Sequence, residues 1–326
     1  MIIARTPLRI SLGGGGTDLP FYCDNYGSSL VSATINKYIY VTVNSRAEKN
    51  IKLNYSKTEI IDDVNQIQHP TIKEALKLLK INNPIEIHSM AEIPSGTGLG
   101  SSGAFLVGLL NALNYYKGNI VSKYKLAEDA SEIMMNKLKE PCGKQDQYAC
   151  SFGNITNIRI TPKGKVSVSP INISYENLQK LEKNLMLFYT GIKRDANKVL
   201  AAQTKKSKNR EYYDEIQKIG NQSLKCLEQG KFDKFGQWMH AHWLLKRKLT
   251  SNMTNDKIDK IYEKARSLGA IGGKLIGAGG GGFLMLYVYG VRHPEIFKAM
   301  EKEGLTYTPF KFDYEGSKIV YDGQHF

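Results

Sequence analysis

The sequence predicts an α+β fold built from two domains. With 326 residues, 41% of them hydrophobic, the chain is long enough to bury two ordinary cores. Residues 28–35, 38–43 and 51–54 are rich in β-branched and aromatic side chains, as is typical of strands. Antiparallel strands that lead into a loop and a helix are typical of an α+β domain and not of a doubly wound sheet. We expect domains at residues 1–173 and 174–326.

The first domain begins with an alternating strand that breaks at four glycines, residues 13–16. Four glycines in a row indicate a backbone that bends sharply or lets another group approach closely. Apolar periodicity predicts the remaining elements. They are a helix over 72–80, a strand from residue 85, helices over 103–116 and 125–138, and a strand over 155–160.

The second domain is predicted to be helix-rich, with a short sheet. Its strands are expected at residues 185–190, 284–289, 305–313 and 317–322. Its helices are expected at 195–206, 211–229, 231–249, 256–268 and 294–303. This order of elements suggests a ferredoxin-like domain.

Composition narrows the class of protein. The net charge is +14, but the lysines are spread over many segments and are not interleaved with aromatics, so we expect solvated faces and no nucleic-acid partner. The four cysteines form no C-x-x-C pair, which indicates a reducing, cytoplasmic compartment.

The amino terminus carries arginines within its apolar pattern and predicts neither a signal peptide nor a membrane span. The sequence leaves the oligomeric state open.

Residues 93–105, IPSGTGLGSSGAF, form a segment that we call the glycine loop. Glycines let consecutive N–H groups turn toward one point, and the helix that follows adds its unpaired donors, so this segment predicts a phosphate cradle. A dinucleotide site would need an acidic residue about 20 positions later, where residues 122–125 read SKYK. No Gly-Lys-Ser/Thr follows the loop, which excludes a Walker motif.

The segment from Pro94 to Ala104 resembles the phosphate loop of the GHMP kinases, which phosphorylate small molecules with ATP. Glycine-rich segments at residues 7–18 and 274–283 resemble the first and third motifs of the same family, in the same order. The resemblance implies the GHMP kinase fold, with nucleotide and substrate in a cleft between the two domains. The residues it implies for ATP are Pro94, Ser95, Gly96, Gly98, Leu99, Gly100, Ser101, Ser102 and Gly103.

The first motif ends in Thr17 and Asp18, which place a hydroxyl and a carboxylate beside the glycines. This variant resembles the sugar-phosphate branch of the family, in which the matching aspartate binds sugar hydroxyls and the arginine matching Arg9 lies beside the catalytic carboxylate. A simple turn residue is the alternative for Asp18. Including the basic end of a strand and the third motif, the implied substrate-binding residues are Gly14, Gly15, Gly16, Thr17, Asp18, Arg194 and Gly280.

Asp146 is the predicted catalytic base. It stands in residues 140–148, EPCGKQDQY, which we expect to form a tight polar turn, and a kinase needs a carboxylate near the acceptor oxygen. The Gly-Lys-Gln-Asp-Gln sequence resembles the segment that carries the catalytic aspartate in the galactokinase-like branch. Lys144 is assigned to neutralising phosphate charge, and an exposed turn aspartate is the alternative for Asp146.

Magnesium is the expected metal cofactor. The family usually carries a magnesium-binding glutamate about seven residues before the proline, but Met134 occupies that position here. Ser101 or Ser102, the ATP phosphates and water would then hold the cation. Glu128 or Glu132 would replace the glutamate only after a change of helix register. His240 and His242 are two apart on a helix, which disfavours chelation of a metal by both.

The resemblance implies an ATP-dependent sugar kinase. The implied acceptor is D-glycero-D-manno-heptose 7-phosphate, phosphorylated on its anomeric oxygen to the 1,7-bisphosphate for nucleotide-heptose and surface polysaccharide synthesis. A related kinase for fucose or galactose is one alternative. A catalytically silent sensor of sugar and nucleotide is another, favoured by Met134 and disfavoured by Asp146 and Arg9. The residues alone indicate a small, polar, anionic acceptor.

Overall fold

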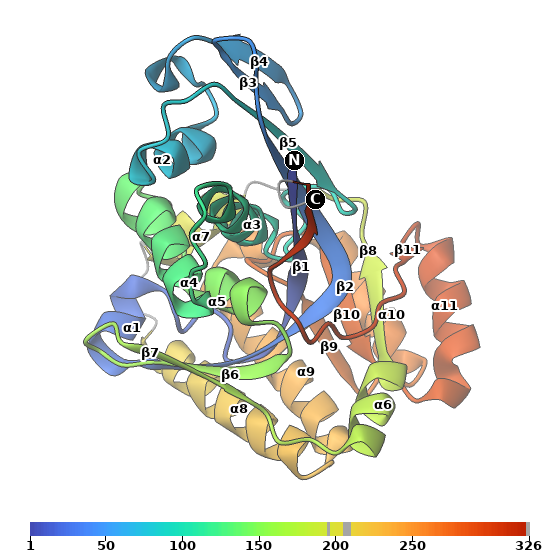
Figure 1. The fold of residues 1–326 in the computed structure, drawn as a ribbon. Coiled ribbons are helices and arrows are strands. Elements are labelled where there is room, and N and C mark those ends of the chain that lie inside the picture. Colours follow the sequence, from blue (N-terminus) through green and yellow to red (C-terminus); the bar gives the residue numbers. More distant parts are fainter. Residues whose placement is uncertain (194–195, 205–209, 324–326) are drawn as a thin grey trace.

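Two antiparallel-rich sheets organise the chain in the computed structural model, which describes residues 1–193, 196–204 and 210–323 (Figure 1). Within these residues the larger sheet has the order β12-β1-β2-β5-β3-β4, and β6 and β7 extend it from β2. Its strands are β1 (Ile2–Gly13), β2 (Ser28–Ser45), β3 (Ile51–Asn54), β4 (Thr58–Ile61), β5 (Ile85–Ala91), β6 (Ile155–Ile160), β7 (Val166–Pro170) and β12 (Lys318–Asp322).

The strand β2 is one continuous element where the sequence predicts two, at 28–35 and 38–43. The register with β1 explains the difference. Pro7 pairs with Tyr38 and the next residue, Leu8, pairs with Ile35, so two residues of β2 bulge without ending the strand. The bulge keeps the alternating apolar side chains of both strands directed into one core.

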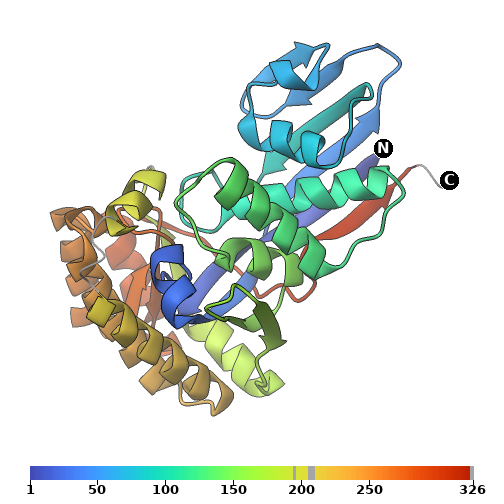
Figure 2. The ribbon, with the colours of Figure 1, turned by 90° about the vertical axis from the view of Figure 1, so that its left-hand side faces the viewer.

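Helices cover this sheet on the side seen in Figure 2, where α3 runs along the strands. α3 packs against β1 and β2, and α5 packs against α3 and α4. The elements are α1 (Pro20–Tyr26), α2 (Pro70–Leu78), α3 (Ser101–Tyr116), α4 (Lys123–Ser131), α5 (Gln145–Phe152) and a short 3₁₀ turn, Val64–Gln66. The predicted helix over 125–138 is continuous, but it changes from α4 to a π-helical segment at residues Glu132–Lys137.

The smaller sheet has the order β11-β8-β10-β9 in the described part of the chain, with antiparallel neighbours. Its strands are β8 (Leu185–Tyr189), β9 (Gly272–Leu275), β10 (Phe283–Tyr287) and β11 (Thr306–Tyr307). Its helices are α6 (Tyr175–Asn184), α7 (Ala196–Thr204), α8 (Arg210–Glu228), α9 (Phe232–Leu249), α10 (Asp256–Ser267) and α11 (His293–Lys302), with 3₁₀ turns at Ser251–Met253 and Gly290–Arg292. The β-helices-β-β-α-β order is the ferredoxin-like pattern that the sequence predicts, with β9 as a strand the prediction missed.

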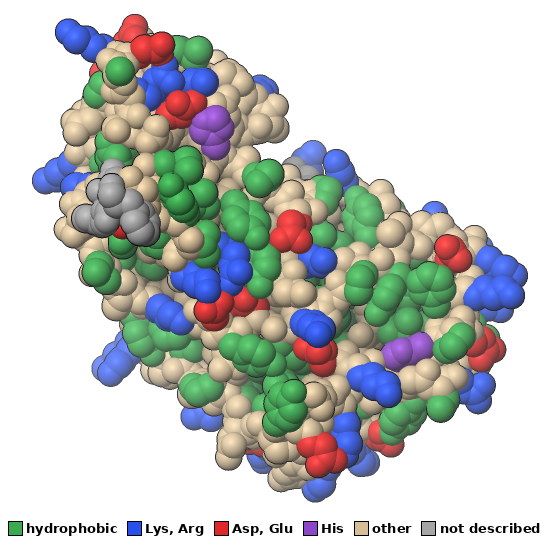
Figure 3. All heavy atoms as spheres, turned by 45° about the vertical axis from the view of Figure 1, so that its right-hand side comes forward, with side chains coloured by type: hydrophobic (Ala, Val, Ile, Leu, Met, Phe, Trp, Pro, Cys, Tyr) green, Lys and Arg blue, Asp and Glu red, His purple; other side chains and the backbone are tan. Residues whose placement is uncertain are grey.

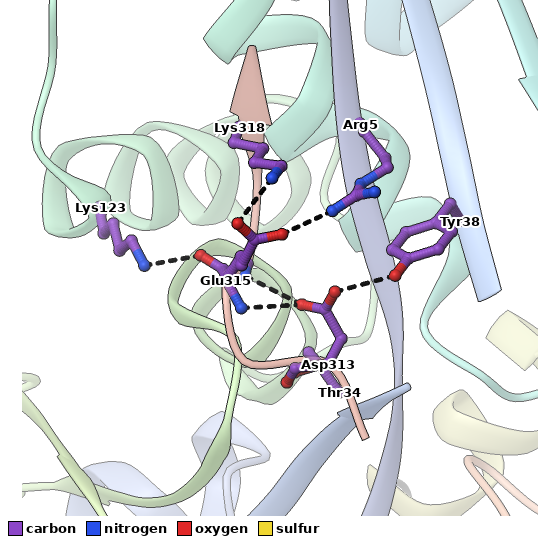
Figure 4. Close-up of polar contacts among 8 residues, drawn as sticks. Arg5, Thr34, Tyr38, Lys123, Asp313, Glu315 and Lys318 are labelled. Carbon is purple, nitrogen blue, oxygen red and sulfur yellow. Dashed lines mark hydrogen bonds and ion pairs between the residues drawn. The ribbon is translucent and has the colours of Figure 1, made fainter. Parts of the chain in front are cut away.

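The chain ends by returning to the larger sheet, where β12 pairs with β1. Figure 4 shows the polar network before that strand. The Asp313 carboxylate accepts hydrogen bonds from the Tyr38 hydroxyl at 3.0 Å and from the Glu315 and Gly316 N–H groups. The Thr34 hydroxyl donates to the Asp313 carbonyl. The predicted boundary between residues 173 and 174 stays a prediction, and the final strand adds to the first sheet.

Basic side chains are dispersed over the face of the molecule that Figure 3 shows. On the face in Figure 3, lysines and arginines alternate with acidic and apolar side chains and form no continuous basic stripe. The described helices include none with the length and apolar character needed to cross a membrane.

Candidate active site

The glycine loop leads directly into α3, as the sequence predicts. Gly96, Gly98 and Gly100 all have positive φ, and Gly100 is the N-cap of α3. The first-turn N–H groups of a helix have no partner within the helix, and its dipole is positive at this end. The loop is anchored to β1, because the Arg9 N–H donates to the Leu99 carbonyl at 3.0 Å and the Arg9 guanidinium to the Gly98 carbonyl at 2.6 Å.

The Arg9 guanidinium also binds Asp146. Its Nε and Nη2 atoms lie 2.8 Å and 2.6 Å from Asp146 Oδ1, and the arginine side chain is 6% exposed. Asp146 stands in the first turn of helix α5, so the expectation that residues 140–148 form a tight polar turn is corrected at this residue. A carboxylate in a first helical turn is favoured by the helix dipole. Gly103 allows the close packing, because a Cβ there would lie 2.7 Å from the Asp146 Cβ.

Asp18 faces the same region and is buried. Its Oδ2 accepts a hydrogen bond from the Gln145 N–H at 3.0 Å. Gly143 makes room for it, since a Cβ at that position would lie 2.1 Å from Asp18 Oδ2. Burial raises the pKa of the Asp18 carboxyl, and the Asp146 carboxylate adds to this, whereas the Gln145 N–H and the Arg9 guanidinium act in the opposite direction. The two carboxyls thus differ in environment.

Two cavities adjoin at the start of α3, and Ser101, Ser102 and Met134 line both. The smaller, about 130 Å³, contains the Arg9, Asp18 and Asp146 side chains. Its lining also includes Ser11, Gly15, Gly16, Gly96, Gly98, Gly100, Gln145, Gln203, Lys246, Lys274 and Gly277. The larger, about 570 Å³, has an apolar and aromatic wall with Ile39, Tyr55, His69, Met90, Ile93, Pro94, Ser95 and Phe105.

Other predicted site residues lie outside these cavities. The buried Thr17 hydroxyl donates to the Gly14 carbonyl and contacts Ser28, so it stabilises the turn itself. Lys144 Nζ lies 3.1 Å from the Glu128 carboxylate. The Gly280 N–H donates to the Met253 carbonyl at 2.7 Å. Leu99 of the glycine loop is fully buried, and Arg194 lies outside the described residues.

The third glycine-rich segment, residues 274–283, packs against the glycine loop. A Cβ at Gly282 would lie 1.9 Å from the Thr97 carbonyl oxygen, so only glycine permits this contact. The same segment brings Lys274 and Gly277 to the smaller cavity, and α9 brings Lys246. Sequence reasoning missed both lysines as site residues, because in the sequence they are two among many cations.

The side chains at the site could bind magnesium only together with the phosphates of a bound nucleotide. Ser101 and Ser102 present hard hydroxyl oxygens to both cavities, whereas the thioether of Met134 is a poor magnesium ligand. Glu128 is paired with Lys144, and Glu132 contacts Asn136 and Lys137. Among the described residues there is no group of three or more His, Cys, Asp or Glu side chains that would hold a metal.

This arrangement can hold a polyphosphate at the glycine loop and present a carboxylate to a hydroxyl in the adjoining cavity. It defines a kinase of small molecules. The family comparisons agree: the model of the GHMP kinase N-terminal domain matches residues 70–154 and that of the C-terminal domain matches residues 223–304. The chain belongs to the GHMP kinase family, whose members use ATP as phosphate donor.

Individual relatives cover nearly the whole chain. It is 29% identical to the D-glycero-alpha-D-manno-heptose 7-phosphate kinase of Campylobacter jejuni, over 97% of this chain and 98% of that one. A galactokinase of Pyrococcus furiosus is 26% identical over 96% of both chains. Among solved structures, a D-glycero-D-manno-heptose 1-phosphate kinase from Bacteroides thetaiotaomicron has a TM-score of 0.82 at 24% identity, covering 99% of this chain and 100% of that one. The last similarity supports the fold.

Proposed function

We propose that this protein transfers the γ-phosphoryl group of ATP to the anomeric hydroxyl of D-glycero-D-manno-heptose 7-phosphate, giving the 1,7-bisphosphate. The observation that carries the proposal is the Arg9–Asp146 pair, which lies in one cavity with Asp18 and the glycine loop. The similarity to the C. jejuni heptose 7-phosphate kinase, which extends over nearly the full length of both chains, supports the choice of acceptor. The product would serve nucleotide-heptose and surface polysaccharide synthesis.

In this proposal the larger cavity takes the nucleoside of ATP. Tyr55, His69 and Phe105 offer an apolar, aromatic wall for a base, and Pro94 and Ser95 lead from that wall into the glycine loop. The amides of Gly96 to Gly103 and the start of α3 then bind the phosphates. Magnesium, held by Ser101 or Ser102 and the phosphates, would neutralise charge on the triphosphate.

Asp146 acts on the acceptor. Its carboxylate binds the anomeric hydroxyl and takes its proton as the oxygen forms a bond to the γ-phosphorus and the bond to the ADP oxygen breaks. Arg9 fixes the orientation of Asp146, because two of its nitrogens bind the same carboxylate oxygen. Asp18 receives hydrogen bonds from sugar hydroxyls. Most of the rate acceleration then comes from positioning and from stabilising charge.

The test is ADP release with Mg-ATP and heptose 7-phosphate, mannose 6-phosphate, fucose, galactose or no sugar. We expect turnover on heptose 7-phosphate and a loss of at least about 100-fold in kcat for Asp146→Asn, with ATP binding retained. Asp24→Asn, an exposed aspartate, is the matched control. Turnover on fucose or galactose alone would contradict the acceptor and favour the related sugar kinases, to which the similarity with galactokinase points.

A catalytically silent sensor is the second candidate, because Met134 stands beside Ser101 and Ser102 in both cavities. Binding of ATP and sugar without ADP release from any of the sugars would support that function. ADP release that Asp146→Asn abolishes would exclude it.

A further inference from the structure

Two buried lysines line the smaller cavity on the wall contributed by α9 and β9. Lys246 is 6% exposed and Lys274 is 2% exposed. Lys246 Nζ donates to the Gly277 carbonyl at 2.8 Å. Lys274 Nζ lies 3.3 Å from His242 Nδ1, so its polar partner in the described part of the chain is an imidazole and not a carboxylate. Both ammonium groups are therefore held in place by the second domain.

The surroundings of Lys274 disfavour its charge when no anion is present. Burial lowers the pKa of Lys274 well below its usual value, and the nearby Lys246 and Arg9 cations lower it further. The cavity wall holds these three basic side chains against the two carboxyls of Asp18 and Asp146. Arg9 already pairs with Asp146, and an anion bound beside Lys274 would compensate for the burial of its ammonium group.

A hydroxyl donor completes the arrangement. Ser11 lines the same cavity, and its buried Oγ has no hydrogen-bond partner among the described residues. The position of a Cβ on Gly15 would lie 2.5 Å from this oxygen, so the absence of a side chain at Gly15 leaves Ser11 accessible. Burial and the Lys274 and Lys246 cations lower the pKa of His242, and the backbone of Gly15 acts in the opposite direction, which places Gly15 near His242 as well.

Lysine ammonium groups and an unbonded serine hydroxyl are hydrogen-bond donors of the kind that bind a phosphate group. Glycines of the glycine loop line the same cavity as the lysines, but the phosphates of ATP already have the amides of that loop and of the start of α3 as donors. The larger cavity, which has the aromatic wall for a nucleoside, contains neither lysine. The lysines line the cavity that holds Asp18 and Asp146, where the acceptor lies in the proposed function. An anion at the lysines would therefore come from the acceptor more readily than from the nucleotide.

We propose that Lys246, Lys274 and Ser11 form a binding site for the phosphate group of the acceptor. This inference rests on the proposed function for the identity of the acceptor. It makes the two lysines specificity-determining residues, since they would distinguish a phosphorylated sugar from the free sugar.

The experiment measures binding by calorimetry without ATP turnover, for the wild type, Lys274→Met and Lys246→Met. Lys248→Met, an exposed lysine on the same helix α9, is the control. The probes are heptose 7-phosphate, unphosphorylated heptose, inorganic phosphate and a non-hydrolysable ATP analogue. We expect the Kd for heptose 7-phosphate and for phosphate to rise at least about tenfold in both buried variants. The Kd for free heptose and for the ATP analogue should stay within about twofold. Methionine is apolar and of similar length, so the variants should fold, and thermal unfolding checks this.

The outcomes separate the two proposals. An unchanged Kd for heptose 7-phosphate in Lys274→Met would overturn the inference and leave the proposed function standing. A loss confined to the ATP analogue would overturn it as well, because the lysines would then bind the nucleotide phosphates. If the wild type does not use heptose 7-phosphate but binds inorganic phosphate through Lys274 and Lys246, the proposed acceptor is wrong and the anion site is supported.

Discussion

Asp18 and Asp146 are two carboxyls of one cavity in different surroundings. Asp146 has an arginine partner at 2.6 Å and is 30% exposed, whereas Asp18 is 7% exposed and receives a hydrogen bond from the Gln145 N–H. The pKa of Asp18 is raised chiefly by burial. Asp146 is thus held in place by an arginine, and Asp18 is suited to bind hydroxyl groups at a cost in stability.

Asp18→Asn tests that cost. The pKa of Asp18 in the folded state lies above its usual value of 3.8, so the folded state holds the proton more tightly than the unfolded state. The free energy of unfolding therefore falls as pH rises from the usual pKa to the pKa of the folded state. Asparagine keeps an acceptor for the Gln145 N–H and carries no charge. We expect Asp18→Asn to raise Tm at pH 7 by about 2 °C and to weaken acceptor binding.

Thermal unfolding at pH 7 and near pH 3 checks this prediction, with Asp24→Asn as the exposed control. Near pH 3 the advantage should vanish, because the aspartate is then protonated in both the folded and the unfolded state. A lower Tm at pH 7 than in the wild type would show that the Asp18 charge stabilises the fold.

At the scale of elements, the site depends on how closely α3 approaches α5 and β1. Gly103 faces Asp146 at the start of α3, and Gly108 faces Thr6 further along the same helix. A Cβ at either position would lie 2.7 Å from its neighbour. The two glycines therefore allow similar close packing, but only Gly103 faces Asp146, the proposed catalytic base.

Gly103→Ala and Gly108→Ala form a matched pair. Overpacking should lower the free energy of unfolding by about 1–3 kcal/mol in both variants. Only Gly103→Ala should reduce kcat, by at least about tenfold, because the added methyl group displaces Asp146 from the acceptor hydroxyl. Denaturant unfolding and steady-state kinetics measure the two effects. Equal kcat values in the two variants would show that Asp146 tolerates the displacement.

At the scale of the whole molecule, the carboxyl-terminal segment ties the second half of the chain to the first sheet (Figure 4). Asp313 is 5% exposed and accepts from Tyr38, and the Lys123 ammonium donates to the Glu315 carbonyl at 2.8 Å. Burial, together with the hydrogen bond to Asp313, raises the pKa of Tyr38 to about 12, so the phenol stays protonated and donates at neutral pH. The network holds β12 beside β1.

Asp313→Ala should therefore destabilise the molecule. The Tyr38 hydroxyl and the Glu315 and Gly316 N–H groups would lose their acceptor, at a cost of about 2–3 kcal/mol in the free energy of unfolding. Tyr38→Phe removes one of these bonds and should cost about 1 kcal/mol. Urea unfolding measures both, with Glu303→Ala as an exposed control. The KM for ATP should stay unchanged, and a large increase in it would mean that the segment also shapes the nucleotide cavity.

The sequence by itself determined the α+β class and the kinase family. It also singled out Asp18, Asp146 and the glycine loop, which line the candidate site. Features that depend only on residues close together in the chain could be predicted from the sequence. They include the glycine loop with its helix, the turn at Gly13–Asp18 and the strand over 155–160. Three other features could not be predicted, because each depends on a partner strand or helix far away in the sequence. They are the bulge within the strand at residues 28–45, the strand at 272–275 and the helix that carries Asp146.

The resemblance already implied that Arg9 lies beside Asp146, 137 residues away. Only the tertiary structure brought Lys246 and Lys274 to the cavity of Asp18. A lysine in a sequence is by default a solvated charge, and these two are buried because α9 and β9 pack against the first domain at the cavity. A buried ammonium group is stabilised by an anion beside it. Whether a lysine is buried depends on which surfaces pack together in the folded molecule and not on its neighbours in the chain.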